Sequence, residues 1–364
     1  MIRTPIIQER VSLAPLTTLQ VGGTARYFAR AENSAAVVSL LGTARDAGWP
    51  VLVLGGGSNL LVSDNGFSGL VIQLCDQQVR WDFSGSEARL YAGAGVVWDT
   101  LVEAAVSKNC AGLECLSGIP GWVGAAPIQN IGAYGQEVSE TIQTVHAVDR
   151  RSGESVAFDN RACGFAYRHS QFKGPWKDRF VVTGVTFLLQ KNGEPVVRYQ
   201  QLIDHLKREH AHDLASVRDG VLEIRRQKSM VLDAADPNSR SAGSFFMNPI
   251  VSSHVSNDVR AHFERKNIET ENMPAYPTED GQVKLSAAWL MDRLGFVRGY
   301  GDGPVGLSSN HALALINRGE AKASDVMQLA GTIVRTVRSE IGVTLMPEPA
   351  FVGFDAPVSD LLGL

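Results

Sequence analysis

The feature that most constrains this fold is a segment rich in small residues, LECLSGIPGWVGAAPIQNIGAYG, at positions 113–135. Its glycines and prolines are too frequent for a core helix, and the segment is too apolar for a solvent-exposed loop. Two interpretations follow. The segment wraps a large planar ligand and offers main-chain groups to its polar edge, or it is a buried irregular loop.

A second glycine cluster, GGGSN at 55–59, follows the apolar run Val51–Leu54. Consecutive backbone N–H groups after a strand can form an anion-binding nest, and the alternative is a tight glycine turn. The cluster is not a phosphate-binding Walker loop, because no Gly-Lys-Ser/Thr follows it. It is not a dinucleotide-binding fingerprint either, because residues 60–62 are expected to continue extended instead of opening a helix.

Length and composition define the class of protein. The 364 residues suffice for two or three domains, and 44% hydrophobic with 20% charged residues is typical of globular proteins. A net charge of −4 without a long basic stretch argues against a nucleic-acid surface. No signal peptide and no membrane-spanning run are expected. Four cysteines without CxxC or zinc spacing predict structural thiols in a reducing cytoplasm and no metal site; they are Cys75, Cys110, Cys115 and Cys163.

The chain changes character twice along its length. A helix capped at Asn33 or Ser34 and ended by Gly48, with strands at 51–54 and 69–72, predicts a small first unit. Short strands alternating with turns then predict an α+β region with a substantial sheet over about 75–225. Its expected elements are strands at 88–91, 145–148 and 180–182, a hairpin turn at 151–153 and a helix at 98–108. Beyond 226, the apolar periodicity predicts helices at 284–294 and 324–341.

Ser244 occupies an unusual frame, because GSFFMNP places its hydroxyl between a glycine and two phenylalanines. A nucleophilic serine requires a base and an oxyanion hole, whereas a proton-donating serine requires a strongly basic acceptor. No GxSxG elbow surrounds Ser244. The residues alone leave a third interpretation, a buried turn serine, equally open.

Several motifs in order resemble the UDP-N-acetylenolpyruvoylglucosamine reductase family, flavoenzymes of peptidoglycan precursor synthesis. The matching stretches are GGGSNLLVSD (55–64), GLECLSGIPGWVGAAPIQNIGAYG (112–135), FAYR (165–168), SAGSFFMNP (241–249), YPTEDGQVKLSAAWL (276–290) and LMPE (345–348). The resemblance implies an α+β fold of three domains. FAD-binding subdomains of the vanillyl-alcohol-oxidase type span 1–74 and 75–225, a substrate-binding domain spans 226–350, and residues 351–364 return to the first subdomain.

The resemblance also implies the cofactor and the reaction. Non-covalent FAD, reduced by NADPH, passes a hydride to the enolpyruvyl ether of UDP-N-acetylglucosamine enolpyruvate and yields UDP-N-acetylmuramate. The GGGSN cluster at 55–59 meets the pyrophosphate, and the 113–135 segment meets the isoalloxazine. The implied cofactor contacts are Gly55, Gly56, Gly57, Ser58, Asn59, Ser117, Gly118, Ile119, Gly121, Gly124, Ala125, Gln129, Asn130 and Ala133, with Arg225 near the flavin's pyrimidine edge.

Three residues match the family's catalytic positions. Arg168 matches the arginine that stabilises the enol, and its planar guanidinium suits a carboxylate. Ser244 matches the proton donor, and Glu348 matches the glutamate that acts with the arginine. The residues implied to bind substrate are Tyr199, on the mobile loop of the family's first subclass, Lys228, Asn248 and Tyr276. Met247 stands where many members carry lysine.

The family further implies a cytoplasmic monomer that binds no nucleic acid and enters no membrane. Two other classes of protein remain as alternatives. A sugar or alcohol oxidase of the same fold often tethers FAD through a histidine, but His146 and His169 are not in a recognisable tethering context. The other alternative is a sugar-nucleotide binding protein without redox chemistry.

Overall fold

The structure is a computed structural model that describes residues 5–209, 212–278 and 280–364. The chain forms two compact units, each built from segments that are distant in sequence. The first unit comprises residues 1–11, 25–57 and 67–232, and the second comprises 12–24, 58–66 and 233–364. The expected boundaries of three domains stay a prediction.

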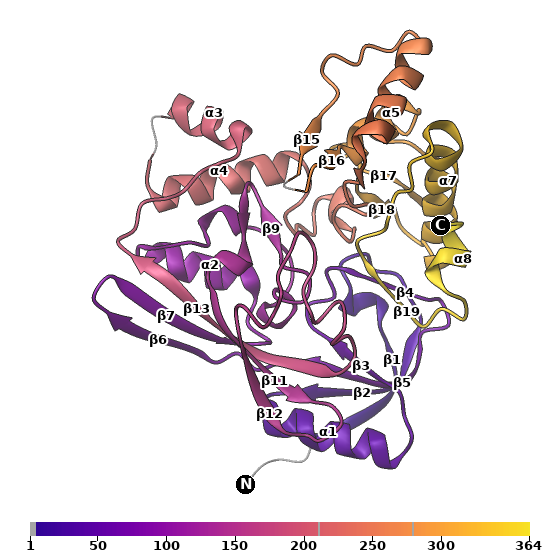
Figure 1. Ribbon diagram of the computed structural model, residues 1–364. Coiled ribbons are helices and arrows are strands. Elements are labelled where there is room, and N and C mark those ends of the chain that lie inside the picture. The colour runs from indigo at the N-terminus through magenta and orange to yellow at the C-terminus, as the bar shows by residue number, and fades with distance from the viewer. Residues whose placement is uncertain (1–4, 210–211, 279) are drawn as a thin grey trace. The chain divides into compact units, whose positions relative to one another are not determined.

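The smaller sheet of the first unit has the strand order β1-β2-β5-β3. Its central strand, β5 (Phe67–Leu74), pairs in parallel with both β2 (Thr24–Ala31) and β3 (Val51–Leu54). Helix α1 (Ser34–Asp46) packs its apolar stripe against this sheet, and the Asn33 side chain accepts a hydrogen bond from the Ala36 N–H. The predicted helix and strands are therefore confirmed (Figure 1).

The larger sheet has the order β12-β11-β13-β7-β6, with β8 also paired to β13. The long strand β13 (Phe180–Lys191) forms antiparallel ladders with β11 (Ile142–Asp149) and β7 (Glu87–Gly93). Helix α2 (Trp98–Ser107) buries Trp98 against Phe187, whose ring centroid lies 6.0 Å away. This arrangement confirms the α+β class and the substantial sheet expected for this part of the chain.

The first unit also contains the following strands and helices. They are β1 (Ile7–Ser12), β6 (Val79–Ser84), β8 (Cys110–Ala111), η2 (Glu114–Leu116), η3 (Val123–Ala125), β9 (Gly132–Ala133), β10 (Gln136–Glu137), η4 (Val138–Glu140), β12 (Ser155–Asp159), α3 (Gln200–Glu209) and α4 (Leu214–Gln227). All four cysteines are free thiols, and three of them are buried.

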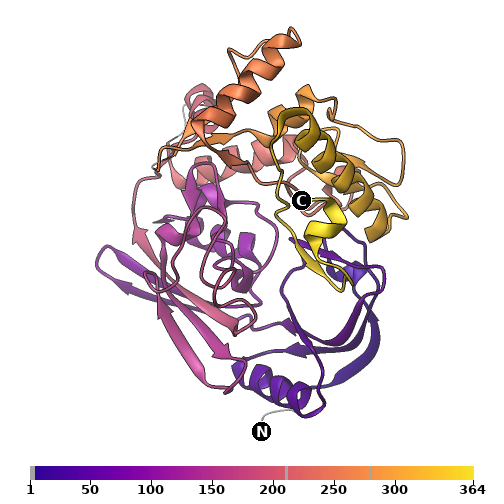
Figure 2. The same ribbon diagram turned by 45° about the vertical axis from the view of Figure 1, so that its right-hand side comes forward.

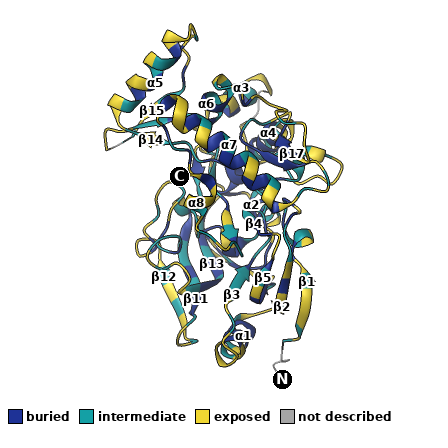
Figure 3. Ribbon diagram, turned by 90° about the vertical axis from the view of Figure 1, so that its right-hand side faces the viewer, coloured by how far each residue is buried: buried dark blue, intermediate teal, exposed yellow. Residues whose placement is uncertain are grey.

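The second unit packs small sheets around helix α7 (Ala323–Ile341), whose buried and exposed sides are visible in Figure 3. The helix ends at Gly342 with φ 68°, as predicted from its sequence. Helix α8 (Val358–Leu362) lies beside α7, where Arg338 Nη1 donates to the Gly363 carbonyl oxygen (Figure 2). The other elements are η1 (Ala14–Leu16), β4 (Leu60–Val62), η5 (Pro237–Ser239), β14 (Ile250–Val251), α5 (Ser253–Arg265), β15 (Ala275–Pro277), β16 (Val283–Leu285), α6 (Ala287–Arg293), β17 (Val305–Leu307), β18 (Leu315–Asn317) and β19 (Ala350–Val352).

Strand β4 confirms that the chain stays extended after the GGGSN cluster at 55–59. It pairs in parallel with β19, so that Leu61 is opposite Phe351 in the ladder. A segment near the N-terminus and one near the C-terminus therefore complete the same unit. Within the described residues, no helix combines the length and the apolar character needed to cross a bilayer.

The predicted start of the helix at 284–294 is wrong. Lys284 lies in β16, between β14 and β15, and α6 begins only at Ala287. Strand pairing on both sides satisfies the backbone groups of residues 283–285, and the Ser286 hydroxyl then accepts from the Trp289 N–H as the helix cap. Tertiary pairing thus overrides the helical pattern of these residues.

The backbone around Gly66 leaves no room for a side chain. Gly66 has φ 74°, and a Cβ there would lie 2.0 Å from the Thr24 carbonyl oxygen. Gly66→Ala is expected to lower the free energy of unfolding by about 2–5 kcal/mol, because left-handed strain and overpacking act together. Gly342→Ala is the matched control, since Gly342 has φ 68° but nothing within 4 Å. Equal losses of stability in urea-induced unfolding would contradict the role of the close approach.

Candidate active site

The two glycine-rich segments meet inside the first unit. A Cβ on Gly56 would lie 3.0 Å from both Gly121 Cα and Trp122 Cδ1, and Gly57 has φ 64°. Glycine is therefore required where the turn after β3 passes residues 121–122. Gly124 is equally close to its neighbour, since its Cβ would lie 2.5 Å from the Ala94 Cβ.

The 113–135 segment is mostly buried or half-buried and irregular, as the buried-loop interpretation predicts, and its role in binding a planar ligand stays a prediction. The Ser117 hydroxyl donates to the Glu114 carbonyl oxygen over 2.6 Å. Among the other predicted contacts, Gly118 and Asn130 are buried, Ile119, Gln129 and Ala133 are half-buried, and Ala125 is exposed.

Asp99 and Arg218 fix the segment at Gly118, and sequence reasoning missed both. The Gly118 N–H donates to Asp99 Oδ1 over 2.6 Å, and Arg218 donates to both carboxylate oxygens over 2.6 and 2.8 Å. Burial on its own would raise the pKa of Asp99, but the hydrogen bonds from Arg218 and Gly118 hold this pKa below its ordinary value. An aspartate in the first turn of a helix is too ordinary a feature to reveal this role.

Arg168 is tied to the same segment from a neighbouring loop. Its Nη2 donates to the Gly132 carbonyl oxygen over 3.1 Å, and its backbone has the left-handed φ of 52°. The Asn130 amide donates to Ala166 O over 3.2 Å, and the Ser170 hydroxyl donates to Ile128 O over 2.6 Å. These bonds bring the predicted catalytic arginine to the predicted flavin segment, with local backbone strain of the kind found at functional sites.

Tyr134 joins three other predicted residues. Its ring centroid lies 5.4 Å from that of Tyr199, Lys228 Nζ lies 6.0 Å from the same centroid, and the Arg225 charge interacts electrostatically with the Tyr134 side chain. Burial, together with the nearby Arg225 charge, lowers the pKa of Lys228, and burial likewise lowers that of Arg225. Lys228 Nζ also donates to Gln201 Oε1 on α3 over 3.0 Å.

Arg225 provides a test of whether the first unit fits a flavin. Its Nε atom is buried and has no hydrogen-bond partner among the described residues, while its Nη2 donates to Met230 O. A Cβ on Gly118 would lie 3.3 Å from this Nε atom. A buried cation beside a glycine that cannot carry a side chain fits the polar edge of a planar cofactor, so the residues present suit FAD.

Ser244 and Glu348 lie on neighbouring backbone segments in the second unit. Phe246 and Pro347 form an antiparallel bridge, and the Glu348 N–H donates to the Phe245 carbonyl oxygen over 2.8 Å. Phe245 and Phe246 are fully buried, so this pairing is anchored in the core. Ser244 and Glu348, which are distant in sequence, therefore each lie one or two residues from the same backbone bridge.

The second unit also contains four residues predicted to contact the cofactor or the substrate. Asn59 Nδ2 donates to the Glu348 carbonyl oxygen over 3.4 Å, and the Ser58 carbonyl oxygen lies 3.4 Å from the Thr18 hydroxyl. Asn248 Oδ1 accepts from the Ala287 N–H at the start of α6, and Tyr276 is exposed on β15. Asn248 is therefore engaged in holding a helix end.

His311 is the main residue of the second unit that the sequence analysis did not identify. Its Nε2 lies 3.0 Å from the Ser244 Oγ atom. The two residues are separated by 67 positions in the chain, and no motif around His311 indicates the contact. Only the folded chain reveals the pair.

The hydrogen bonds that Asp99 accepts from Gly118 and Arg218 predict a measurable effect of Asp99→Asn. Loss of the charged hydrogen bonds is expected to lower the free energy of unfolding by about 1–3 kcal/mol and FAD affinity by roughly tenfold. Because the folded pKa of Asp99 is lowered, this stabilisation is present above the ordinary carboxyl range and disappears as pH falls through the folded pKa. Asp82→Asn makes the same change at an exposed site of the same unit. FAD titrations that do not distinguish the two variants would refute the role of Asp99.

Known proteins resemble the chain in both sequence and structure. Residues 236–352 match the family described as UDP-N-acetylenolpyruvoylglucosamine reductase, C-terminal domain, and residues 25–159 match the FAD binding domain family. The UDP-N-acetylenolpyruvoylglucosamine reductase of Thermobifida fusca is 45% identical over 96% of this chain and 99% of its own length. That of Streptomyces coelicolor is 44% identical over 94% of this chain and 89% of its own length.

A solved structure adds to this result. The crystal structure of UDP-N-acetylenolpyruvylglucosamine reductase (MurB) from Thermus caldophilus is 26% identical, covers 96% of this chain and 100% of its own, and gives a TM-score of 0.65. The likeness therefore extends over nearly the whole of each chain, as the motifs in the sequence imply. On these grounds, the chain belongs to the UDP-N-acetylenolpyruvoylglucosamine reductase family.

Proposed function

We propose that this chain is an FAD-dependent oxidoreductase that reduces the enolpyruvyl ether of UDP-N-acetylglucosamine enolpyruvate to UDP-N-acetylmuramate with NADPH. The observation that carries the proposal is the bridge between Phe246 and Pro347, which holds Ser244 and Glu348 on paired backbone segments. Family membership supports the reductase over an oxidase or a simple sugar-nucleotide binder. The proposal includes a monomer acting in the cytoplasm in peptidoglycan precursor synthesis.

The residues of the first unit hold the cofactor and stabilise charge. FAD, when bound, would supply the chemistry of hydride transfer from NADPH to the methylene carbon of the enolpyruvyl group. The glycine turn at 55–57 and the 117–133 segment hold it through main-chain groups, with Arg225 at its polar edge. Arg168 stabilises the negative charge that develops on the carboxylate side of the substrate.

The residues of the second unit complete the reaction. Hydride addition leaves an electron pair on the carbon next to the substrate carboxylate. The Ser244 hydroxyl donates its proton to that carbon, so that a C–H bond forms as the O–H bond breaks. Glu348 polarises the enol together with Arg168. Tyr199, Lys228, Asn248 and Tyr276 are the proposed contacts to the remainder of the substrate.

One assay tests the whole proposal. The purified protein reconstituted with FAD should oxidise NADPH only when UDP-N-acetylglucosamine enolpyruvate is added, with one product molecule formed for each NADPH consumed. The control omits the enolpyruvyl substrate and supplies UDP-N-acetylglucosamine in its place. A protein that binds no FAD, or that oxidises NADPH equally with either compound, does not have this activity.

A further inference from the structure

The contact between His311 and Ser244 has a direct consequence for proton transfer. Their Nε2 and Oγ atoms are 3.0 Å apart, a distance at which one atom donates a hydrogen bond to the other. A serine hydroxyl has one proton to donate and two lone pairs that accept. If this proton points at the imidazole, it is unavailable to a substrate carbon.

We propose that His311 is a positioning residue, which donates its Nε2–H to Ser244 Oγ and so directs the serine proton away from the imidazole. This inference rests on the proposed function, because it presumes that Ser244 is the proton donor. The O–H bond of Ser244 breaks as the new C–H bond forms, and the electron pair remains on Oγ. The Nε2–H then stabilises the resulting alkoxide, and water returns the proton to Oγ.

The backbone keeps this contact in place. The Phe245 N–H, one residue after Ser244, donates to the Leu313 carbonyl oxygen over 2.8 Å. The Ala314 N–H donates to the His311 carbonyl oxygen over 3.2 Å, which closes a turn. Since Phe245 and Leu313 are buried, this backbone bond holds the serine segment against the histidine turn beside the contact.

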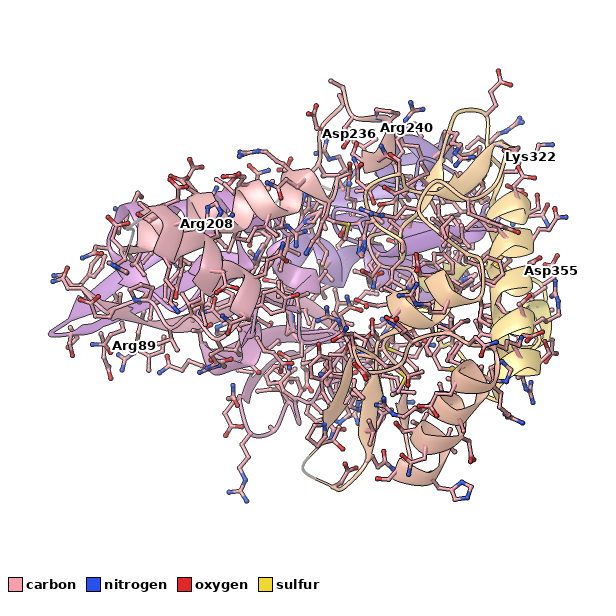
Figure 4. The ribbon with its side chains drawn as sticks, turned by 90° about the horizontal axis from the view of Figure 1, so that it is seen from above. Arg89, Arg208, Asp236, Arg240, Lys322 and Asp355 are labelled. Atoms are coloured by element: carbon pink, nitrogen blue, oxygen red, sulfur yellow. The ribbon has the colours of Figure 1, made fainter. Side chains whose placement is uncertain are left out.

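A second anchor holds the loop that precedes His311. The Ser309 N–H donates to Asn238 Oδ1 over 3.0 Å, and the Asn310 N–H donates to the Ser308 hydroxyl over 3.1 Å. Asn238 belongs to η5, in the segment that runs from Asp236 to Arg240 and is labelled in Figure 4. The imidazole is therefore carried by a loop that is fixed at each end, which suits a group that orients another.

Two substitutions of His311 distinguish the loss of the hydrogen bond to Ser244 from a general effect on the structure. In His311→Gln, the side-chain Nε2 still donates to Ser244, whereas His311→Ala removes the donor. We expect NADPH to reduce the flavin of both variants at rates within about twofold of wild type. Reoxidation by the enolpyruvyl substrate should slow about 10–100-fold in His311→Ala and less than about fivefold in His311→Gln. His254→Ala, at an exposed position on α5 of the same unit, is the control and should leave both half-reactions unchanged.

The tautomer provides a readout that does not depend on activity. Long-range ¹H–¹⁵N spectra of histidine-labelled protein, assigned by the signals lost in His311→Gln, should show His311 protonated at Nε2. Protonation at Nδ1 alone would overturn the proposal. So would normal reoxidation in His311→Ala, equal slowing in the Ala and Gln variants, or equal loss of both half-reactions. If wild-type protein is not reoxidised by the enolpyruvyl substrate, the proposed function fails instead, whatever the variants do.

Discussion

Ser244→Ala should abolish the protonation step while sparing flavin reduction. In the proposed mechanism the serine hydroxyl supplies the proton that completes the product, so its loss is expected to slow reoxidation by the enolpyruvyl compound about 10²–10⁴-fold. Reduction by NADPH requires no such proton and should remain within about twofold of wild type. Stopped-flow absorbance of the flavin measures the two half-reactions separately. Normal reoxidation of the alanine variant would exclude Ser244 as the donor.

The control for this result must preserve the surroundings of Ser244. Ser339→Ala removes an exposed hydroxyl of α7 in the same unit without touching the backbone bridge that carries Ser244. Its half-reactions should both resemble those of wild type. The buried Phe245 and Phe246 fix the segment independently of the Ser244 hydroxyl, so we expect the thermal midpoint of Ser244→Ala to change little.

Arg168→Lys should impair the same half-reaction despite keeping the positive charge. The guanidinium presents a planar fork that an ammonium cannot reproduce at a carboxylate. Removing one well-placed donor to a developing anion slows reactions about 10²–10³-fold, which is the expected loss in reoxidation rate. The hydrogen bond to Gly132 O ties Arg168 to the predicted flavin segment, so a small loss of FAD affinity should accompany it.

Arg161→Lys provides a matched control for this change, because Arg161 is exposed and lies seven residues earlier in the chain. It should leave both half-reactions and FAD affinity at wild-type values. If Arg168→Lys slows reduction by NADPH as much as reoxidation, the arginine supports flavin binding and not the developing charge. Fluorescence titration with FAD distinguishes these two results.

Local signals predicted much of the fold. Asn33 precedes an apolar stripe and marks the start of α1, and Gly342 follows an apolar stripe and marks the end of α7. Both are predictable because capping depends on neighbours in the chain. The wrong start of α6 has a different origin. Residues 283–285 are held as a strand by β14 and β15, and such pairing is invisible to a pattern read along one segment.

The residues of the candidate site fall into the same two groups: those that local motifs indicate and those that only folding brings together. Motifs in order indicated Arg168, Ser244 and Glu348, and the glycines of the two cofactor segments. Asp99 and His311 act through contacts with Gly118 and Ser244, which are created by folding across long intervals of chain. Single aspartates and histidines are common at such positions, so a sequence offers no reason to choose these two.

The parallel pair of β4 and β19 has a consequence for biosynthesis. Residues 60–62 emerge from the ribosome long before their partners at 350–352. All segments of the first unit, in contrast, are available once residue 232 has been made. The nascent chain can therefore complete its cofactor-binding unit well before Glu348 can pair beside Ser244. Termination between residues 232 and 348 would leave a polypeptide that has every segment of the first unit but lacks Glu348, the residue proposed to polarise the enol.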